Sequence, residues 1–126
     1  MSENEIATKV LDVAFAIHRE LGPGLLESVY EEVMYYELMN EYGFYVKRQQ
    51  PIPVIWKKMR LELGFRSDLI VENKLLVELK SVEILAAVHP KQVLTHLKLT
   101  GIKLGLLINF NEALLKNGIK RIVNNL

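Results

Sequence analysis

The fold is decided by two short segments, Arg66-Ser67-Asp68-Leu69-Ile70-Val71 and Leu75-Leu76-Val77-Glu78-Leu79-Lys80. Both are rich in aliphatic residues and only residues 72–74 separate them, which predicts a β-hairpin. If residue 73 is the centre of the loop, Leu69 lies opposite Val77 and Asp68 lies opposite Glu78. Side chains alternate between the two faces of a strand, so one face carries the odd-numbered aliphatic residues and the other carries Asp68, Glu78 and Lys80.

The second face of this hairpin is the chemically informative one. Side chains opposed across a hairpin have Cβ atoms about 4.5–5.5 Å apart, and like charges so placed destabilise the sheet unless a cation lies nearby. Carboxylate oxygens suit Mg²⁺, and such an ion can act as a Lewis acid or lower the pKa of a bound water. Lys80 would orient or deprotonate that water, or stabilise charge on a phosphate. A two-residue loop would instead put Asp68 and Glu78 on opposite faces, and an ordinary surface hairpin explains the same residues without chemistry.

Periodic apolar residues predict two helices before the hairpin. Ser2 and Glu5 have the spacing of a capping box, and apolar residues then recur at steps of three and four as far as Leu21. The Gly22-Pro23-Gly24 segment ends that helix. A second helix is predicted over about Leu25–Asn40.

The remaining segments predict a mixed sheet with one further helix. Strands are expected at Phe44–Gln49, Ile52–Trp56, Met59–Phe65, Arg66–Val71, Leu75–Lys80 and Leu104–Phe110, a helix at Pro90–Thr100, a helical turn near Glu112–Lys116, and a candidate edge strand near Ile119–Val123. The order is α-α-β-β-β-β-α-β, which predicts an α/β (α+β) fold with a mixed central sheet flanked by helices. No linker or repeat divides residues 1–126, so we expect one domain.

The formal net charge of +1 conceals a gradient along the chain. Residues 1–43 contain two basic and nine acidic residues and sum to −7, whereas residues 44–126 contain 14 basic and six acidic residues and sum to +8. Such asymmetry is typical of proteins that contact a polyanion or a membrane surface. Acidic helices with a solvated face explain it equally well.

Composition excludes several other classes of protein. The chain has no cysteine, which excludes disulfides, thiolate metal sites and cysteine nucleophiles, and three histidines leave little for a His-rich metal site. The polar segment 1–5 does not resemble a secretory signal. No run approaches the roughly 20 apolar residues of a membrane span. We therefore expect a soluble cytoplasmic protein without a membrane partner.

Two motifs together resemble a known family. Asp68 followed by Glu78-Leu79-Lys80 resembles the PD-(D/E)xK nuclease signature in its degenerate form, with Ser67 where the signature's name has proline. The segment 24–30, Gly-Leu-Leu-Glu-Ser-Val-Tyr, matches G-x-x-E-x-x-Y, the pattern that names the GxxExxY branch of that superfamily. The similarity extends from about Val10 through Gln92 to the C-terminal part of the chain.

The resemblance implies a restriction-endonuclease-like core and a set of site residues. Asp68, Glu78 and the backbone carbonyl of Leu79 would hold Mg²⁺ or Mn²⁺, and Lys80 would be the catalytic lysine. The first core helix would contribute Glu27 to the metal site, and Gln92 would position the attacking water. Without the resemblance, pattern alone favours ordinary surface roles for Glu27 and Gln92.

The leading hypothesis is a metal-dependent nuclease acting on DNA or RNA, with DNA favoured. Four basic residues would neutralise backbone phosphates: Lys57, Lys58, Arg60 and Arg66. The alternative is a non-catalytic nucleic-acid-binding or protein-interaction module that retains the fold. A homodimer is compatible with the sequence, because cutting both strands of a duplex needs two active sites, and Trp56 is a candidate edge contact.

Overall fold

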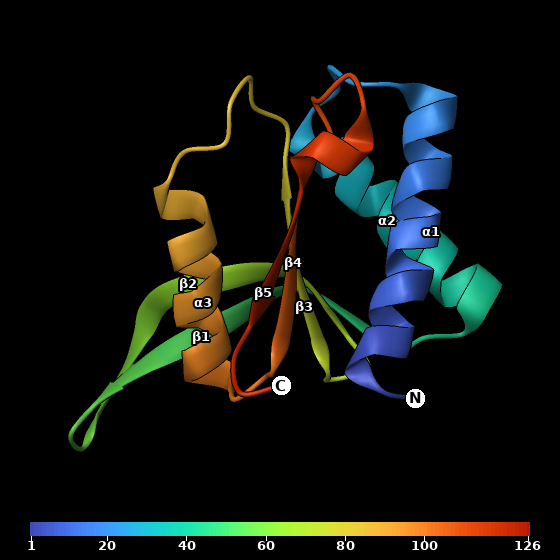
Figure 1. Cartoon of the computed structure of the whole chain (residues 1–126). Helices are drawn as coiled ribbons and strands as arrows, with labels where there is room; N and C mark the ends of the chain where they lie inside the picture. Colours follow the sequence, from blue (N-terminus) through green and yellow to red (C-terminus); the bar gives the residue numbers. More distant parts are fainter.

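Five strands form one mixed sheet with helices on both faces. The computed structural model describes the backbone of all 126 residues and the side chains of all except Leu63. The elements in chain order are α1 (Glu3–Leu21), α2 (Glu27–Tyr42), β1 (Val46–Trp56), β2 (Met59–Val71), β3 (Leu75–Lys80), α3 (Val88–Thr100), β4 (Leu104–Asn109), the 3-10 helix η1 (Leu115–Gly118) and β5 (Ile119–Val123) (Figure 1). No helix in the described part of the chain combines the length and the hydrophobicity that a membrane crossing requires.

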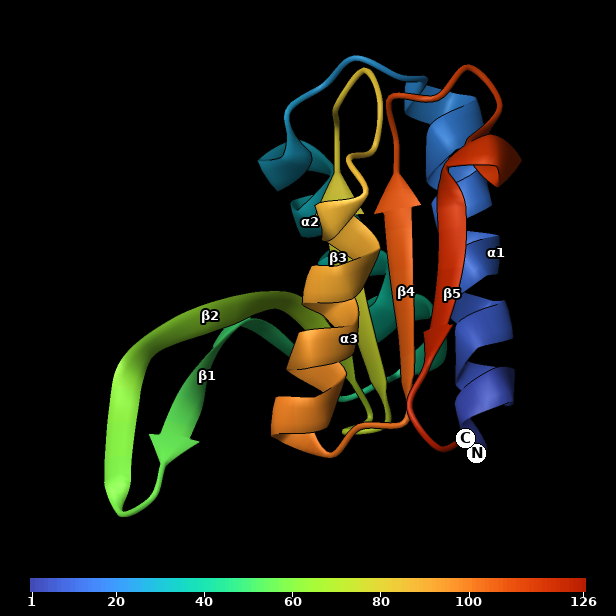
Figure 2. The same cartoon turned by 60° about the vertical axis from the view of Figure 1, so that its left-hand side comes forward.

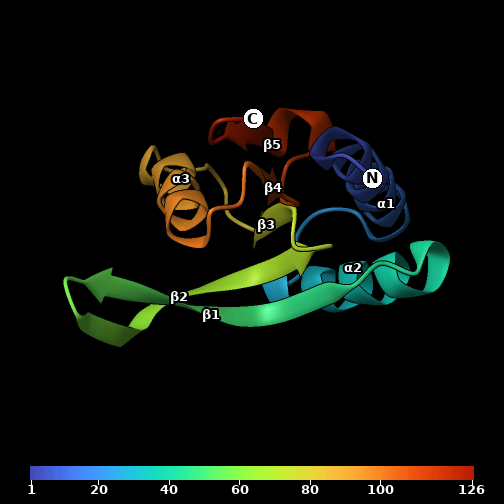
Figure 3. The same cartoon turned by 90° about the horizontal axis from the view of Figure 1, so that it is seen from below.

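The sheet has the order β1-β2-β3-β4-β5, and β3 pairs with β4 in parallel while all other neighbours are antiparallel. The parallel pair is joined by the crossover helix α3, as a parallel connection requires. Helices α1 and α2 cover one face and α3 covers the other (Figure 3). The predicted α+β fold class, the mixed sheet and the order of elements along the chain are confirmed.

Two pairs of predicted strands are each one continuous strand in the structure. The segments 59–65 and 66–71 form β2, and the segments 44–49 and 52–56 form most of β1. Pro51 and Pro53 do not interrupt β1 because it is an edge strand. An edge strand tolerates proline where the missing N–H would have faced solvent rather than a neighbouring strand. The two strands pair along their length, apart from a register shift between Ile52 and Val54.

The predicted capping box at Ser2 is confirmed, and α2 begins and ends two residues later than the predicted Leu25–Asn40. The Ser2 hydroxyl accepts a hydrogen bond from the Glu5 N–H at 3.2 Å, and the Glu5 carboxylate accepts one from the Ser2 N–H at 3.2 Å. Gly43 ends α2 in the left-handed conformation, with φ of 64°, which glycine adopts without strain. Helix α3 begins at Val88, two residues before the predicted start at Pro90.

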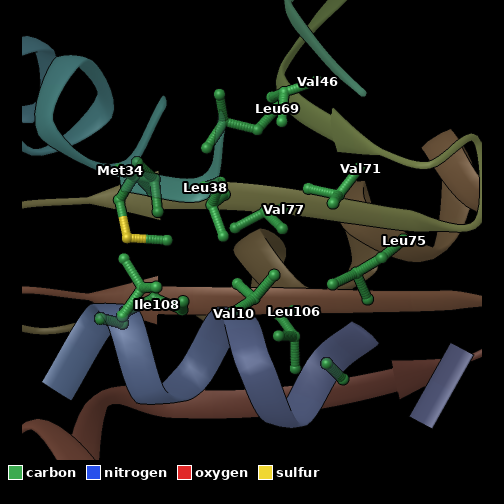
Figure 4. Close-up of a cluster of buried hydrophobic side chains, with 14 of the residues drawn as sticks. Val10, Met34, Leu38, Val46, Leu69, Val71, Leu75, Val77, Leu106 and Ile108 are labelled. Carbon is green, nitrogen blue, oxygen red and sulfur yellow. The ribbon is translucent and has the colours of Figure 1, made fainter. Parts of the chain in front are cut away.

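The hairpin register is as predicted. Val71 pairs with Leu75, Ile70 with Leu76, and Leu69 with Val77. The odd-numbered residues of this hairpin pack beneath α1 and α2 in the main core, together with Val10, Met34, Leu38, Val46, Leu106 and Ile108 (Figure 4). Leu76 faces the other way and packs with Ile52, Val93, Leu97 and Leu107 under α3. Strand β3 is thus buried on both faces, so a charged residue on it is held inside the protein.

The outer part of β1 and β2 projects beyond the helices as an arm (Figure 2). We define the arm as residues 54–61. Its tip leaves large apolar side chains in solvent, and Trp56 is 63% exposed. The arm therefore contributes little to the core of its own chain.

Candidate active site

Strands β2 and β3 separate where Asp68 would pair with Glu78. The paired residues between the two strands extend as far as Leu69 and Val77. Beyond that pair, the N–H of Leu79 donates to Oδ2 of Asp68 at 2.8 Å, whereas in a continued antiparallel ladder it would donate to a backbone carbonyl. The carboxylate of Asp68 is therefore turned into the fork between the strands.

The carboxyl group of Asp68 is strongly perturbed. Burial raises its pKa from 3.8 to about 7, and the nearby charge of Glu78 adds to the increase. Hydrogen bonds from the Leu79 N–H and from Gln49 lower the pKa of Asp68, but their effect is smaller than that of burial and of the Glu78 charge. Two carboxyl groups that repel each other in a partly buried fork form a site that favours an added cation.

Glu78 lies on the α3 face of β3 and is only 7% exposed. Its Oε1 atom is 3.3 Å from Nδ1 of His96 on α3. The ring of His96 packs against Phe65, with centroids 4.3 Å apart, and its Nε2 atom is buried without a hydrogen-bond partner among the described residues. His96 was not among the predicted site residues. Its signal in the sequence is its position four residues after Gln92, which puts both on one helix face.

Lys80 and Gln92 meet beside Glu78. A cavity of about 20 Å³ is lined by Glu78, Lys80, His89, Gln92, Val93, His96 and Leu107. A space of this size is enough for a single water molecule. The structure thus brings three of the predicted site residues, Glu78, Lys80 and Gln92, around one small polar space.

Glu27 lies in the first turn of α2, at the end of β3 that carries Lys80. The N–H of Ser81 donates to Oε2 of Glu27 at 3.4 Å, and the Ser81 hydroxyl donates to the carbonyl of Leu25 at 2.6 Å. The side chain of Glu27 is exposed, and the start of α2 is anchored to the residue that follows Lys80. Glu27 is therefore next to the strand end that carries the lysine.

The tyrosine of the G-x-x-E-x-x-Y segment fixes that start of α2. The hydroxyl of Tyr30 donates to the carbonyl of Gly22 at 2.7 Å and accepts from the N–H of Leu25 at 3.1 Å. Its ring is fully buried and stacks on Phe110 at 4.3 Å, just beyond β4. Tyr30 thus holds the loop that precedes Glu27 against the sheet.

Two polar residues that sequence reasoning missed complete the surroundings of Asp68. Nε2 of Gln49 donates to Oδ1 of Asp68 at 3.1 Å and to Oε1 of Glu31 at 2.5 Å. Glu31 also accepts from Arg48 at 3.1 Å. Glu31 follows Glu27 by one helical turn, which is a detectable signal. Gln49 gives no signal, because its contact with Asp68 depends on pairing between β1 and β2.

Of the four predicted phosphate-binding residues, only Arg66 is close to the site. Its Nη1 donates to the carbonyl of Gln49 at 3.3 Å. Lys57, Lys58 and Arg60 lie at the tip of the arm. Arg60 is eight residues from Asp68 along β2, about 27 Å at the rise of an extended strand. These three residues are remote from the carboxylates.

The donor atoms in the fork fit a hard divalent cation. Within a strand the N–H and C=O of one residue point to the same side, so the carbonyl of Leu79 faces β2, as its N–H does toward Asp68. Mg²⁺ is usually held by one or two carboxylates, with water and substrate phosphates filling the remaining positions. Among the described residues no group of three or more Asp, Glu or His side chains forms a complete metal cluster. The fork therefore offers a two-carboxylate site rather than a closed cage.

One of the comparisons with known proteins found a match. A family model described as the PD-(D/E)XK nuclease superfamily matches residues 4–122. No curated protein and no solved structure gave a significant match.

Proposed function

The chain belongs to the PD-(D/E)XK nuclease superfamily, and on that premise we propose that it is a metal-dependent nuclease that hydrolyses phosphodiester bonds in nucleic acid. The observation that carries the proposal is the fork at Asp68. There, burial and the charge of Glu78 raise the pKa of a carboxyl group to about 7 beside the carbonyl of Leu79. A carboxyl group whose charged form is disfavoured in this way gains from a bound proton or a bound cation, and such perturbed carboxyl groups are typical of functional sites.

Asp68, Glu78 and the carbonyl of Leu79 would hold Mg²⁺ or Mn²⁺, with Glu27 supporting the metal from the start of α2. When bound, the metal would neutralise charge on the scissile phosphate and lower the pKa of a coordinated water. His96 holds the carboxylate of Glu78 from the α3 side, since Nδ1 of His96 lies 3.3 Å from Oε1 of Glu78. Gln49, on β1, orients the carboxylate of Asp68 by donating a hydrogen bond to its Oδ1.

Lys80 and Gln92 would act on the attacking water. Both residues line the small cavity beside Glu78, so they border the same space. The ammonium of Lys80 would stabilise developing negative charge on the phosphate or on the water oxygen. The amide of Gln92 would orient the water. Removing either group should slow the chemical step without loosening the core.

The substrate is DNA or RNA, with DNA ranked first, and the G-x-x-E-x-x-Y segment supports placement in the GxxExxY branch. Arg66 is the basic residue best placed to contact a phosphate near the scissile bond. Lys57, Lys58 and Arg60 would reach only flanking phosphates, because Arg60 is about 27 Å from Asp68 along β2 and the two lysines lie in the turn beyond it. We also propose that residues 1–126 act as one domain in the cytoplasm.

Cleavage assays with matched variants test this proposal. Purified protein is incubated with single- and double-stranded DNA and RNA in Mg²⁺, Mn²⁺ or EDTA, beside Asp68→Ala and Lys80→Ala. The proposal expects metal-dependent products that both variants abolish. An exposed Lys103→Ala variant controls for trace nucleases and should cleave as the unmodified protein does. Equal cleavage by all four proteins, or no cleavage of any substrate, would contradict it.

A second candidate is a nucleic-acid-binding module without turnover. The observation that favours it is that the described residues contain no group of three or more ligand side chains. It predicts binding whose logarithm falls linearly with the logarithm of salt concentration, unaffected by EDTA and without products in the assays above.

A further inference from the structure

A groove of about 540 Å³ lies between α1 and α2 and has no role in the proposed chemistry. We call it the helix groove. Its apolar lining includes Val13, Ile17 and Val33, and four carboxylates stand among these side chains: Asp12, Glu20, Glu37 and Glu41. None of the four carboxylates takes part in an ion pair within the described part of the chain. The groove is thus apolar and carries more negative than positive charge, with Lys9, whose Nζ is 5.2 Å from the centre of the Tyr42 ring, as a basic group beside its lining.

The charges of this groove oppose the stability of α2. Glu37 and Glu41 lie four residues apart on the helix, where like charges repel. Glu41 also stands in the last turn of α2, which has no basic residue and where the helix dipole disfavours an acid. A positive group from outside the helix would relieve both effects.

The arm has the complementary character. Ile55, Trp56 and Met59 are each more than half exposed at its tip. Lys57, Lys58 and Arg60 lie among them, and Nζ of Lys57 is 5.8 Å from the centre of the Trp56 ring. Large apolar side chains seldom stay in solvent as a contiguous group unless they contact a partner. One face of the arm thus presents Trp56 beside its cross-strand partner Met59, and Lys57 and Lys58 at the turn add positive charge, whereas Arg60 is ion-paired with Glu62.

We propose that the arm of one copy of this chain docks in the helix groove of a second copy. The apolar tip, centred on Trp56, enters the groove, and the lysines meet the acids along its rim. The arm and α1–α2 lie on opposite sides of the molecule (Figures 1 and 3), so a chain cannot fill its own groove. The contact joins two different surfaces and is head-to-tail, which generates a ring or an open chain. This inference does not depend on nuclease activity.

A charge-swap experiment tests the contact by sedimentation. The unmodified protein should show an average mass above 14.5 kDa that rises with concentration and falls with added salt. The arm variant Lys57→Glu/Lys58→Glu and the groove variant Glu37→Lys/Glu41→Lys should each stay monomeric. Mixed together, they should associate again. The intact arm of the groove variant meets the intact groove of the arm variant, and at the second contact the exchanged charges are again opposite in sign.

The fluorescence of Trp56 gives a second measurement on the same samples. It is the only tryptophan in the chain, so its emission reports on the arm tip alone. Emission should shift to shorter wavelength as the unmodified protein is concentrated. The groove variant should show no shift alone and should regain it when mixed with the arm variant, although its own arm is unchanged.

Matched controls separate this contact from general charge effects. Lys116→Glu/Lys120→Glu makes the same charge change at exposed positions outside the arm, and Glu83→Lys reverses an exposed acid outside the groove. Both controls should associate as the unmodified protein does. Circular dichroism confirms that every variant is folded. An unmodified protein that is monomeric at all concentrations, or a variant mixture that stays monomeric, would overturn the proposal. So would an arm variant that loses only nucleic-acid affinity.

Discussion

Replacing Asp68 by asparagine should stabilise the metal-free protein while abolishing cleavage. In the folded state the pKa of this carboxyl group is raised from 3.8 to about 7 by burial and by the charge of Glu78. The folded protein therefore holds the proton more tightly than the unfolded chain does. Stability is greatest below the unfolded value and is lost as the pH rises through about 7. Asparagine has almost the same shape and carries no charge in the folded or the unfolded state. An asparagine at this position therefore avoids the free-energy cost of burying a charged carboxylate.

The size of the effect follows from the pKa and the hydrogen bonds. Each step of one in pKa corresponds to about 1.4 kcal/mol, so the change from 3.8 to about 7 costs about 4 kcal/mol at about pH 8 and about 1.5 kcal/mol at about pH 5. The two oxygens of Asp68 accept from Gln49 and from the Leu79 N–H. An asparagine keeps one of these bonds and loses about 1 kcal/mol with the other. The net gain is about 3 kcal/mol at about pH 8 and about 0.5 kcal/mol at about pH 5.

Thermal unfolding in EDTA measures this difference. For a chain of this length the gain corresponds to a rise in Tm of about 10 °C at about pH 8 and about 2 °C at about pH 5. The matched control is Asp12→Asn, the other aspartate in the chain, which is exposed and should change stability by less than about 0.5 kcal/mol at either pH. A destabilised Asp68→Asn protein at the higher pH, or equal gains at both values, would refute the reasoning. Added Mg²⁺ should raise the Tm of the unmodified protein and of Asp12→Asn, but not that of Asp68→Asn.

Three further predictions concern single side chains. Lys80→Met keeps the aliphatic stem and removes the ammonium, so the rate of cleavage should fall at least about 100-fold while the Tm stays unchanged; a rate within tenfold of the original contradicts the role of Lys80. Tyr30→Phe deletes a hydroxyl with two backbone hydrogen bonds and should cost about 1–2 kcal/mol in urea titration, and an unchanged midpoint would show that the hydroxyl does not hold the loop. Gly105→Ala would place a Cβ 2.8 Å from Cγ1 of Val93 and should cost about 1–3 kcal/mol; the cost should shrink in a Val93→Ala background, and equal costs in both backgrounds would exclude the clash.

The hairpin could be predicted because its information is local. The loop of residues 72–74 is short, and Glu72 and Asn73 have φ of 56° and 54°, a conformation that asparagine adopts more readily than most residues. Once that loop is fixed, the pairing of Leu69 with Val77 follows. The same register puts Glu78 and Lys80 on one face of β3, whereas the role expected for Gln92 came from the family resemblance, because pattern alone favoured an ordinary surface glutamine.

The features of the site that could not be predicted depend on contacts between segments that are distant in the sequence. Gln49 reaches Asp68 across 19 positions in the sequence, and no periodic pattern marks it. His96 approaches Glu78 because α3 packs on that face of β3, which the sequence does not specify. The exposure of Trp56 could not be predicted for a similar reason. A strand rich in aromatic and β-branched residues has the composition of a buried strand, and only its neighbours in the fold decide whether it is buried.

The placement of the acidic helices opposite the basic arm makes the molecule an electric dipole. The first 43 residues carry −7 and the remainder carries +8, and the arm and α1–α2 stand on opposite sides (Figures 1 and 3). In the field of any polyanion such a dipole experiences a torque that turns the arm forward and the helices away. The molecule is therefore oriented before it touches the surface, and the fraction of productive encounters falls as salt shortens the range of that field.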